Sequence, residues 1–342
     1  MMGKWRRKPS RWLGIVAGVL IAGVMLYALA RAVDWPTTWQ YMRQVNLLWL
    51  SAALLALLVN NWAKAMRWRL LFPLSQSPPR RGEVFGVLMA GQLLNFTLPF
   101  RGGDISRAYF MGRYRGRSSA AALGSIGAEK LLDIIIMGVL FTLALPFFIL
   151  PQWLESNRVS IWLISAFALL FWGGIVMVLP KAQAWLEIVS QRWPVMARPA
   201  RWAHQMLEGL RALRHRERLA HIILWSFVAW VGSIAATYAL LASLALPASL
   251  PLAIMANVIV QGGMSVPVAP AGVGVFEWLS ILALSLAGIP AEQGLAYGLI
   301  THAAVLFYPV LVGIPWLIVT IQASRQRFLP QRREGTKTRR KP

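Results

Sequence analysis

The sequence lacks cysteine entirely, and acidic residues are scarce, since its 342 residues include 35 Lys and Arg but only 12 Asp and Glu. Without cysteine the chain has no disulfide, no thiolate nucleophile and no thiolate metal ligand. Its four histidines are scattered without the spacing of a metal site. No stretch is long and polar enough for a soluble domain of ordinary size. We therefore expect no metal or cofactor, and we expect any chemistry to occur in or at a membrane.

Long apolar runs are abundant. Apolar residues make up 57% of the chain, charged residues only 14%, and the mean hydropathy is +0.55. Several runs reach about 18 to 25 residues, which is long enough to cross about 30 Å of hydrocarbon as a helix. This pattern predicts an all-α polytopic membrane protein. We place apolar segments at residues 12–30, 47–63, 83–99, 119–146, 159–179, 219–246, 252–268, 274–288 and 293–320.

The net charge of +23 is unevenly distributed between these segments. Basic residues gather on the cytoplasmic side of membrane proteins, where they also contact anionic headgroups. The asymmetry therefore indicates orientation and membrane phospholipids as partners rather than nucleic acid, and it places both termini in the cytoplasm. Five clusters hold 31 of the 35 Lys and Arg, at residues 1–11, 64–81, 101–117, 181–218 and 323–342.

The stretch "LLNFTLPFRGGDISRAYFMGRYRGR", residues 93–117, conflicts with a simple count of crossings. If the segment before it crossed the membrane, its basic cluster would lie outside. The conflict disappears if residues 83–115 form a re-entrant hairpin that enters from the cytoplasm, breaks near Pro99, Gly102 and Gly103, and returns. Irregular backbone at that depth is tolerated only within protein or beside a wet cavity.

A second interruption, "SVPVAPAGVGVFEW", predicts a second re-entrant hairpin over residues 252–288 that breaks at Pro270, Gly272 and Gly274. Aligning Pro99 with Pro270 brings Gly103 onto Gly274. The two hairpins then enter from opposite faces, as in inverted-topology repeats of transporters. The predicted architecture is thus about six full transmembrane helices plus two re-entrant helical hairpins.

The predicted organisation is one transmembrane domain over residues 12–320, preceded by a basic cytoplasmic N-terminus at residues 1–11. Residues 12–30 resemble a signal peptide but are long enough for an uncleaved anchor, which we favour. Residues 181–218 combine helical apolar spacing with eight basic residues, as in amphipathic helices on a headgroup surface. Residues 321–342 form a basic cytoplasmic tail, which we expect to be disordered.

Three ionisable residues interrupt the apolar segment 119–146, namely Glu129, Lys130 and Asp133. Glu129 and Asp133 share a helix face, so they repel unless a cation lies between them or one is protonated, and Lys130 can pair with Asp133. Charges within a membrane usually mark a functional path, here a headgroup or proton site. The alternative is a structural ion cluster that fixes this helix to the charged turn.

The charged turn has two interpretations as well. Arginine matches phosphate geometry, so Arg101 and Arg107, with Asp104 beside them, could hold a lipid headgroup. Otherwise they belong with Arg113, Arg115 and Arg117, which we assign to the cytoplasmic flank.

In the second half, Glu277 could cap the returning helix or line a site. His302 could carry protons or only pack in the helix.

The sequences "NFTLPFRGGDISRAYFMGRYRGRSSAAALGSIGAEKLLD" and "SVPVAPAGVGVFEWLSILALSLAGIP" resemble the lysylphosphatidylglycerol synthase transmembrane region, a flippase-like family. The resemblance extends from about residue 12 to residue 320. Four positions depart from the family pattern, with Asp104 in place of Glu, Lys130 in place of Arg, Ala271 in place of Gly, and His302 in place of Arg. Including the departures Asp104 and Lys130, the family pattern carries over to Asn95, Pro99, Gly103, Asp104, Arg107, Glu129, Lys130, Asp133, Pro270, Gly272, Gly274 and Glu277.

The resemblance implies a translocase of the bacterial inner membrane for an anionic or aminoacylated phospholipid or a related lipid, and not an enzyme. Family members that make lysyl lipid carry an additional soluble domain, so the resemblance does not imply lysine transfer. A lipid-synthesis enzyme is a possible partner. The alternatives are a membrane-embedded lipid-pyrophosphate phosphatase, which would need clustered carboxylates for magnesium, and a lipid-binding accessory protein that does not transport.

Overall fold

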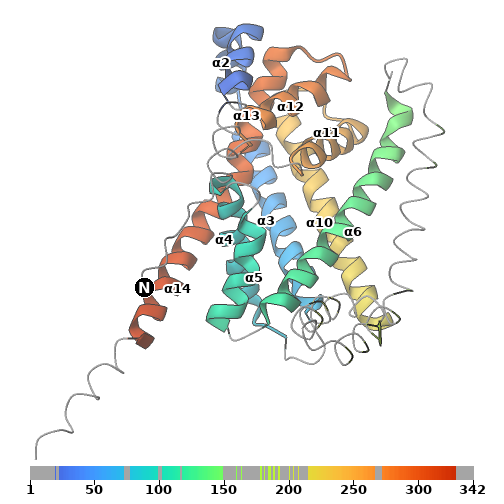
Figure 1. Cartoon of the computed structure of the whole chain (residues 1–342). Coiled ribbons are helices and arrows are strands. Elements are labelled where there is room, and N and C mark those ends of the chain that lie inside the picture. The colour runs from blue at the N-terminus through green and yellow to red at the C-terminus, as the bar shows by residue number, and fades with distance from the viewer. Residues whose placement is uncertain are drawn as a thin grey trace, which may run out of the picture.

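A computed structural model describes residues 23–72, 78–98, 102–115, 118–148, 215–265 and 272–328, together with isolated positions at residue 20 and between residues 159 and 207. These residues are helical apart from short turns (Figure 1). The longer elements are α2 (Trp35–Arg43), α3 (Leu47–Leu70), α4 (Arg81–Thr97), α5 (Gly102–Arg115), α6 (Ser119–Ala144), α10 (Arg216–Ser243), α11 (Leu250–Gly263), α12 (Val275–Ser285), α13 (Ala291–Tyr308) and α14 (Ile314–Phe328).

Four helices in the described part are long and apolar enough to cross a membrane, which confirms a multi-pass membrane protein. They span Leu47–Leu70, Ser119–Phe147, Arg216–Ser243 and Ala291–Ala323. Each corresponds to one of the six full crossings predicted from the sequence. Of the other two, residues 159–179 lie almost wholly outside the described residues, as does most of the predicted amphipathic segment 181–218. The predicted crossing at residues 12–30 is described in part, and its second half belongs to a short apolar helix, Gly23–Ala32.

Helix α3 is longer than we predicted. Asn46 caps its start, since its side-chain oxygen accepts hydrogen bonds from the backbone N–H groups of Leu48 and Trp49. We ended this segment at residue 63, before the first lysine, but the helix continues to Leu70. Its last two turns are well buried despite their basic residues, and this correction determines the functional site described below.

The last crossing continues through Pro309 because the helix widens there. Residues Pro309–Gly313 form a π-helical turn between α13 and α14, which accommodates a proline that cannot donate the usual backbone hydrogen bond. Helix α14 then runs to Phe328, beyond residue 320, where we placed the end of the membrane domain. The first part of the predicted tail is therefore helical, and residues 329–342 lie outside the described part.

Helices α3 and α10 lie antiparallel, with their ends matched. Near one end, Arg218 of α10 donates a hydrogen bond to the carbonyl oxygen of Phe72 (3.1 Å), just past the end of α3. At the other end, the backbone N–H of Asn46 donates to the carbonyl of Ser243 (2.8 Å). Along the chain, helix α4 begins after the end marked by Phe72, and helix α11 begins after the end marked by Ser243. The pairs α4–α5 and α11–α12 therefore start at opposite ends of the bundle, as Figure 1 shows.

Helices α4 and α5 form a hairpin in which glycine permits very close contact. A Cβ atom on Gly103 would overlap the carbonyl oxygen of Gly91 and the backbone nitrogen of Asn95, so only glycine fits there. In the second hairpin, Gly272 and Gly274 adopt positive φ angles of 70° and 82°, a region that other residues avoid. Both breaks predicted from the sequence therefore separate two helices.

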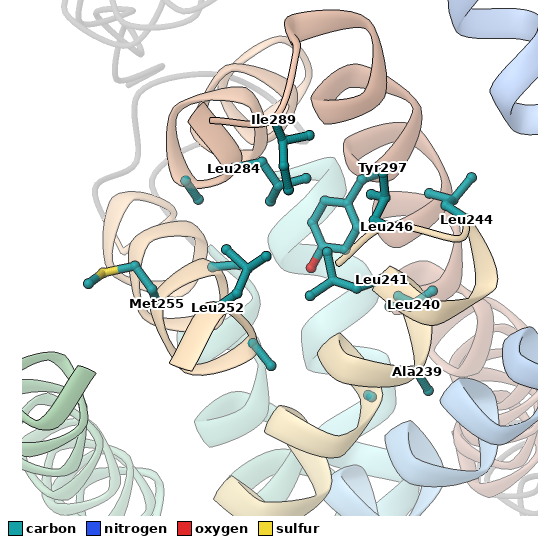
Figure 2. Close-up of a cluster of buried hydrophobic side chains, with 14 of the residues drawn as sticks. Ala239, Leu240, Leu241, Leu244, Leu246, Leu252, Met255, Leu284, Ile289 and Tyr297 are labelled. Atoms are coloured by element: carbon teal, nitrogen blue, oxygen red, sulfur yellow. The ribbon is translucent and has the colours of Figure 1, made fainter. Parts of the chain in front are cut away.

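The largest apolar core lies between α10, α11, α12 and α13. Figure 2 shows the ring of Tyr297 next to Leu241 and Leu246, with Leu252 of α11 nearby. In a bilayer such a core is stabilised by close packing, because lipid chains are as apolar as the side chains themselves. The core fixes the second hairpin firmly to the long helices.

Candidate functional site

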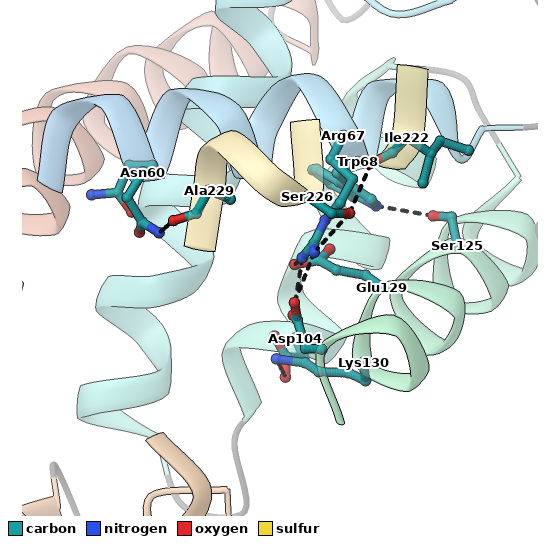
Figure 3. Close-up of polar contacts among 12 residues, drawn as sticks. Asn60, Arg67, Trp68, Asp104, Ser125, Glu129, Lys130, Ile222, Ser226 and Ala229 are labelled. Atoms are coloured by element: carbon teal, nitrogen blue, oxygen red, sulfur yellow. Dashed lines mark hydrogen bonds and ion pairs between the residues drawn. The ribbon is translucent and has the colours of Figure 1, made fainter. Parts of the chain in front are cut away.

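Six charged side chains from α3, α5 and α6 form one ion-pair network, and Arg67 of α3 lies at its centre. Both of its terminal nitrogens bind Asp133, at 2.7 Å and 2.9 Å. One of them also lies 3.7 Å from Glu129. Arg67 is thus the cation between the two carboxylates on α6, and Figure 3 shows its side chain beside Glu129. The network consists of Arg67, Asp104, Arg107, Glu129, Lys130 and Asp133.

Arg107 joins helix α5 to this network from the other side of Glu129. Its Nη2 atom lies 2.7 Å from Glu129 Oε2, and its Nη1 atom lies 3.6 Å from Asp104 Oδ1. Its guanidinium group also lies over the ring of Trp68, 4.0 Å from the ring centroid. Trp68 is held in turn by a hydrogen bond from its indole N–H to Ser125 (2.9 Å). Arg107 is therefore buried and engaged through both of its terminal nitrogens, whereas its Nε atom is buried without a hydrogen-bond partner among the described residues.

The network opens to its surroundings along one side, which we call the polar edge and define as Asp104, Lys130 and Asp133. Lys130 pairs with Asp104 at 3.4 Å, and not with Asp133 as the helix spacing suggested. The Lys130 side chain is 38% exposed, whereas those of Arg67 and Glu129 are 0% and 4% exposed. The side-chain oxygen of Asn95 accepts a hydrogen bond from the backbone N–H of Asp104 and so holds Asp104 in place.

Arg67 was not among the predicted site residues, because we assigned it to a cytoplasmic basic cluster. A usable signal was present, since apolar residues alternate with Lys64, Arg67 and Arg69 in "NNWAKAMRWRL", as in a helix that continues. Arg67 is 0% exposed. A buried arginine requires a carboxylate partner, and the two carboxylates on α6 are the partners it finds.

The network lies toward the end of the bundle that carries the basic residues. Arg67 is three residues before the end of α3, or about 5 Å along its axis. Glu129 and Asp133 are farther from the start of α6, but Figure 1 shows α6 running obliquely across the bundle. The ion pairs of Arg67 with Glu129 and Asp133 join the end of α3 to the middle of α6. The polar edge, which adjoins Arg67 through Asp133, therefore lies near that end of α3.

A second, smaller polar site joins α12 to α13. One carboxylate oxygen of Glu277 accepts the backbone N–H of Gly274 (2.7 Å), and the other lies 2.8 Å from His302 Nδ1. Glu277 therefore caps its helix, which is one of the two roles considered from the sequence, and it also pairs with His302. His302 stacks on Phe276, with ring centroids 4.5 Å apart, and also contacts Phe96 of α4. Phe96 therefore places the end of α4 next to α13.

A row of uncharged polar groups connects α10 and α11, and no pattern in the sequence analysis identified it. The side-chain amide of Asn257 donates to Ser233 (2.8 Å) and to Thr237 (2.9 Å). Gln261 donates to Ser233 (3.1 Å) and to Asn257. Amide and hydroxyl groups bonded in this way hold membrane helices together. These bonds attach the first helix of the second hairpin to the bundle.

Several predicted site residues cannot be placed in this geometry. Pro99, Arg101 and Pro270 lie outside the described residues, as does Arg117. Gly102 begins helix α5 and Gly103 forms its close contact with α4. Within the described ranges, no group of three His, Asp or Glu side chains is arranged to hold a metal ion.

Comparison with known proteins gives one match. The family model described as the lysylphosphatidylglycerol synthase TM region matches residues 15–313, which is most of the chain. No curated protein and no solved structure matches the chain. The match spans every helix that contributes to the ion-pair network and to the Glu277–His302 site.

Proposed function

The chain belongs to the lysylphosphatidylglycerol synthase transmembrane region family, and from this premise we propose that it translocates a lipid with an anionic or aminoacylated headgroup across the membrane. The observation that carries the proposal is the ion-pair network between the first hairpin and the long helices α3 and α6. Charged groups among membrane helices are costly and usually mark a path for a polar substrate. The proposed partners are membrane phospholipids.

We propose that α4–α5 and α11–α12 are re-entrant hairpins related by an inverted repeat, in a bacterial-type inner membrane with both termini in the cytoplasm. Their starts at opposite ends of the α3–α10 pair support this topology. So does a shared contact pattern, in which an acid early in the second helix of each hairpin pairs with a base on the following helix. These pairs are Asp104 with Lys130 and Glu277 with His302. Alternating access would then come from one repeat rocking against the other.

The polar edge is the part of the network that a headgroup would meet. Arg107 is engaged by Glu129 and Trp68, so in this proposal it holds α5 against α6 while the headgroup approaches Asp104 and Lys130. Movement of the α4–α5 hairpin would separate these contacts and expose the buried arginines. The network would thereby couple the position of the hairpin to the presence of a headgroup.

A leaflet-resolved assay in proteoliposomes tests the proposal. Purified wild-type protein should speed the movement of a labelled phospholipid between leaflets. Arg107→Ala and Glu129→Gln should each abolish most of this activity, because each leaves a buried charge without its partner. Arg216→Gln removes an exposed positive charge at the same end of the bundle and should not change the rate. Unimpaired translocation by both network variants would reject these residue assignments.

The pairing of the carboxylates also favours transport over catalysis. A lipid-pyrophosphate phosphatase would need carboxylates free to hold magnesium, but Glu129 and Asp133 bind arginines. We therefore propose a role that is not enzymatic. Release of phosphate from an isoprenyl pyrophosphate by the purified protein would overturn this choice. Lipid binding without translocation would identify an accessory protein.

A further inference from the structure

Lys64 lies beside the ion-pair network without taking part in it. It is on α3 one turn before Arg67, and residues three apart on a helix lie on neighbouring positions of one face. Its side chain is partly buried and interacts electrostatically with Asp133 and Glu129 across the gap to α6. Within the described part of the chain, Lys64 makes no hydrogen bond or ion pair.

The charges around Lys64 do not balance. Four cations, Lys64, Arg67, Arg107 and Lys130, share three carboxylates. The carboxylate that interacts most strongly with Lys64 is Asp133, but Arg67 already binds both of its oxygens. An ammonium group held among apolar helices without an anion costs free energy, so this position favours a bound anion.

Lys130 is the second donor at this position. Its ammonium group lies 3.4 Å from Asp104, which is a loose contact for an ion pair, and its side chain is the most exposed of the network. Lys64 of α3 interacts electrostatically with Asp133 and Glu129, and Lys130 of α6 pairs with Asp104. A tetrahedral anion with several oxygens can accept hydrogen bonds from two ammonium groups at once, whereas a single carboxylate oxygen serves them poorly.

Exposed apolar side chains adjoin the polar edge. Ile105 follows Asp104 on α5 and is 63% exposed, and Ile134 follows Asp133 on α6 and is 56% exposed. In a membrane such side chains contact acyl chains. A ligand with both a phosphate group and acyl chains therefore fits this place better than a small soluble anion.

We infer that Lys64 and Lys130 together bind the phosphate group of a phospholipid at the polar edge. The inference rests on the proposed function, which identifies the ligand as a lipid that the protein translocates. It assigns the phosphate contact to two lysines rather than to Arg107. Lys64 supplies the positive charge that the three carboxylates of the network do not balance. Lys130 moves from Asp104 to the phosphate when the lipid arrives.

Equilibrium binding to the full-length protein in a nonionic detergent tests the inference. The probe is a fluorescent short-chain phosphatidylglycerol, followed by anisotropy. Lys64→Gln should weaken binding about tenfold, as expected for the loss of one charge-assisted contact, and Lys64→Arg should restore most of it. Arg216→Gln should change affinity by no more than about twofold, because an exposed charge contributes little. Equal affinity of Lys64→Gln and wild type, at equal thermal stability, would overturn the site.

Unlabelled competitors distinguish a phospholipid from a soluble phosphate as the ligand of this site. Unlabelled dihexanoylphosphatidylglycerol should displace the probe, whereas inorganic phosphate and dihexanoylglycerol should not at the same concentration. Equal displacement by inorganic phosphate would assign the site to a soluble anion and overturn the lipid ligand. Equal displacement by dihexanoylglycerol would overturn the phosphate contact.

The Lys64→Gln variant tests this inference independently of the proposed function. The binding assay requires no translocation, so Lys64-dependent binding in a protein that moves no lipid would contradict the proposed function alone. Translocation at the wild-type rate by Lys64→Gln would contradict the lysine site alone.

Discussion

The two halves of the molecule use the same contact in different surroundings. In each, an acidic residue near the start of the second hairpin helix pairs with a basic residue on the next helix. Asp104 and Lys130 are 3.4 Å apart and partly exposed, whereas Glu277 and His302 are 2.8 Å apart and buried. The first pair belongs to a network of six charges, and the second stands between two aromatic rings.

This difference indicates a division of roles. A buried pair with a helix cap and stacked rings fixes its hairpin in one position. A partly exposed pair next to unbalanced positive charge can exchange its partner for a ligand. We therefore expect substitutions in the second site to change stability and those at the polar edge to change function.

The largest effect is expected for Arg67→Gln, which would break the centre of the first site. It leaves Asp133 and Glu129 facing each other without their shared cation, and breaking a buried ion pair in this way costs about 3 to 5 kcal/mol. Thermal unfolding in detergent should show a large loss of stability or no folded protein. An unchanged unfolding temperature would show that the Arg67 ion pairs do not hold α3 against α6.

Gly103→Ala should have the next largest effect, because the added Cβ atom meets the backbone of Gly91 and Asn95, which cannot move aside easily. We expect a loss of roughly 1 to 3 kcal/mol, as for overpacking in a core. The matched control is Gly127→Ala on α6, where a Cβ atom meets nothing within 4 Å. That change should be neutral or stabilising by up to about 1 kcal/mol, because alanine favours helix. Equal unfolding temperatures for the two variants would contradict the tight α4–α5 contact.

A pair of double-mutant cycles would sharpen the comparison between the halves. Glu277→Gln with His302→Gln should give a coupling energy of roughly 1 to 3 kcal/mol, because the pair is buried. Asp104→Asn with Lys130→Gln should give about 0 to 1 kcal/mol, as for exposed ion pairs. The measurement is the unfolding free energy of the four proteins in each cycle. A larger coupling for the exposed pair would reverse the proposed division of roles.

The smallest effect on stability is expected for Lys130→Gln, within about 1 kcal/mol of wild type, because the side chain is 38% exposed and its contact is loose. Its effect on lipid translocation should nevertheless be large. Unfolding and transport measured on the same preparation would check both parts. A variant that unfolds early and transports normally would contradict both.

Local patterns predicted the parts of this arrangement that depend on one segment. Apolar run length identified the four crossings that the structure describes, and glycine and proline marked the breaks between α4 and α5 and between α11 and α12. The spacing of Glu129 and Asp133 predicted that they repel unless a cation lies between them or one is protonated, and Arg67 is that cation. These features depend on residues a few positions apart, which a single sequence displays directly.

Contacts between distant segments could not be predicted in the same way. Arg67 and Asp133 are 66 residues apart, and neither segment contains a pattern that identifies the other as its partner. Ending the α3 segment at its first lysine also removed Arg67 from consideration, although a paired arginine can remain inside a helix bundle. The pairing of Lys130 with Asp104 instead of Asp133 depends on the position of α5, which is set by the close contact at Gly103.

The most direct test of the central claim is the initial rate of phospholipid movement in proteoliposomes containing Lys130→Gln, Arg216→Gln or wild-type protein, each normalised to folded protein. Loss of the headgroup contact should lower the Lys130→Gln rate about tenfold or more, while Arg216→Gln stays at the wild-type rate. Lipid movement by Lys130→Gln at the wild-type rate, or no movement by the wild type itself, would contradict the account of the polar edge as the site that receives the headgroup.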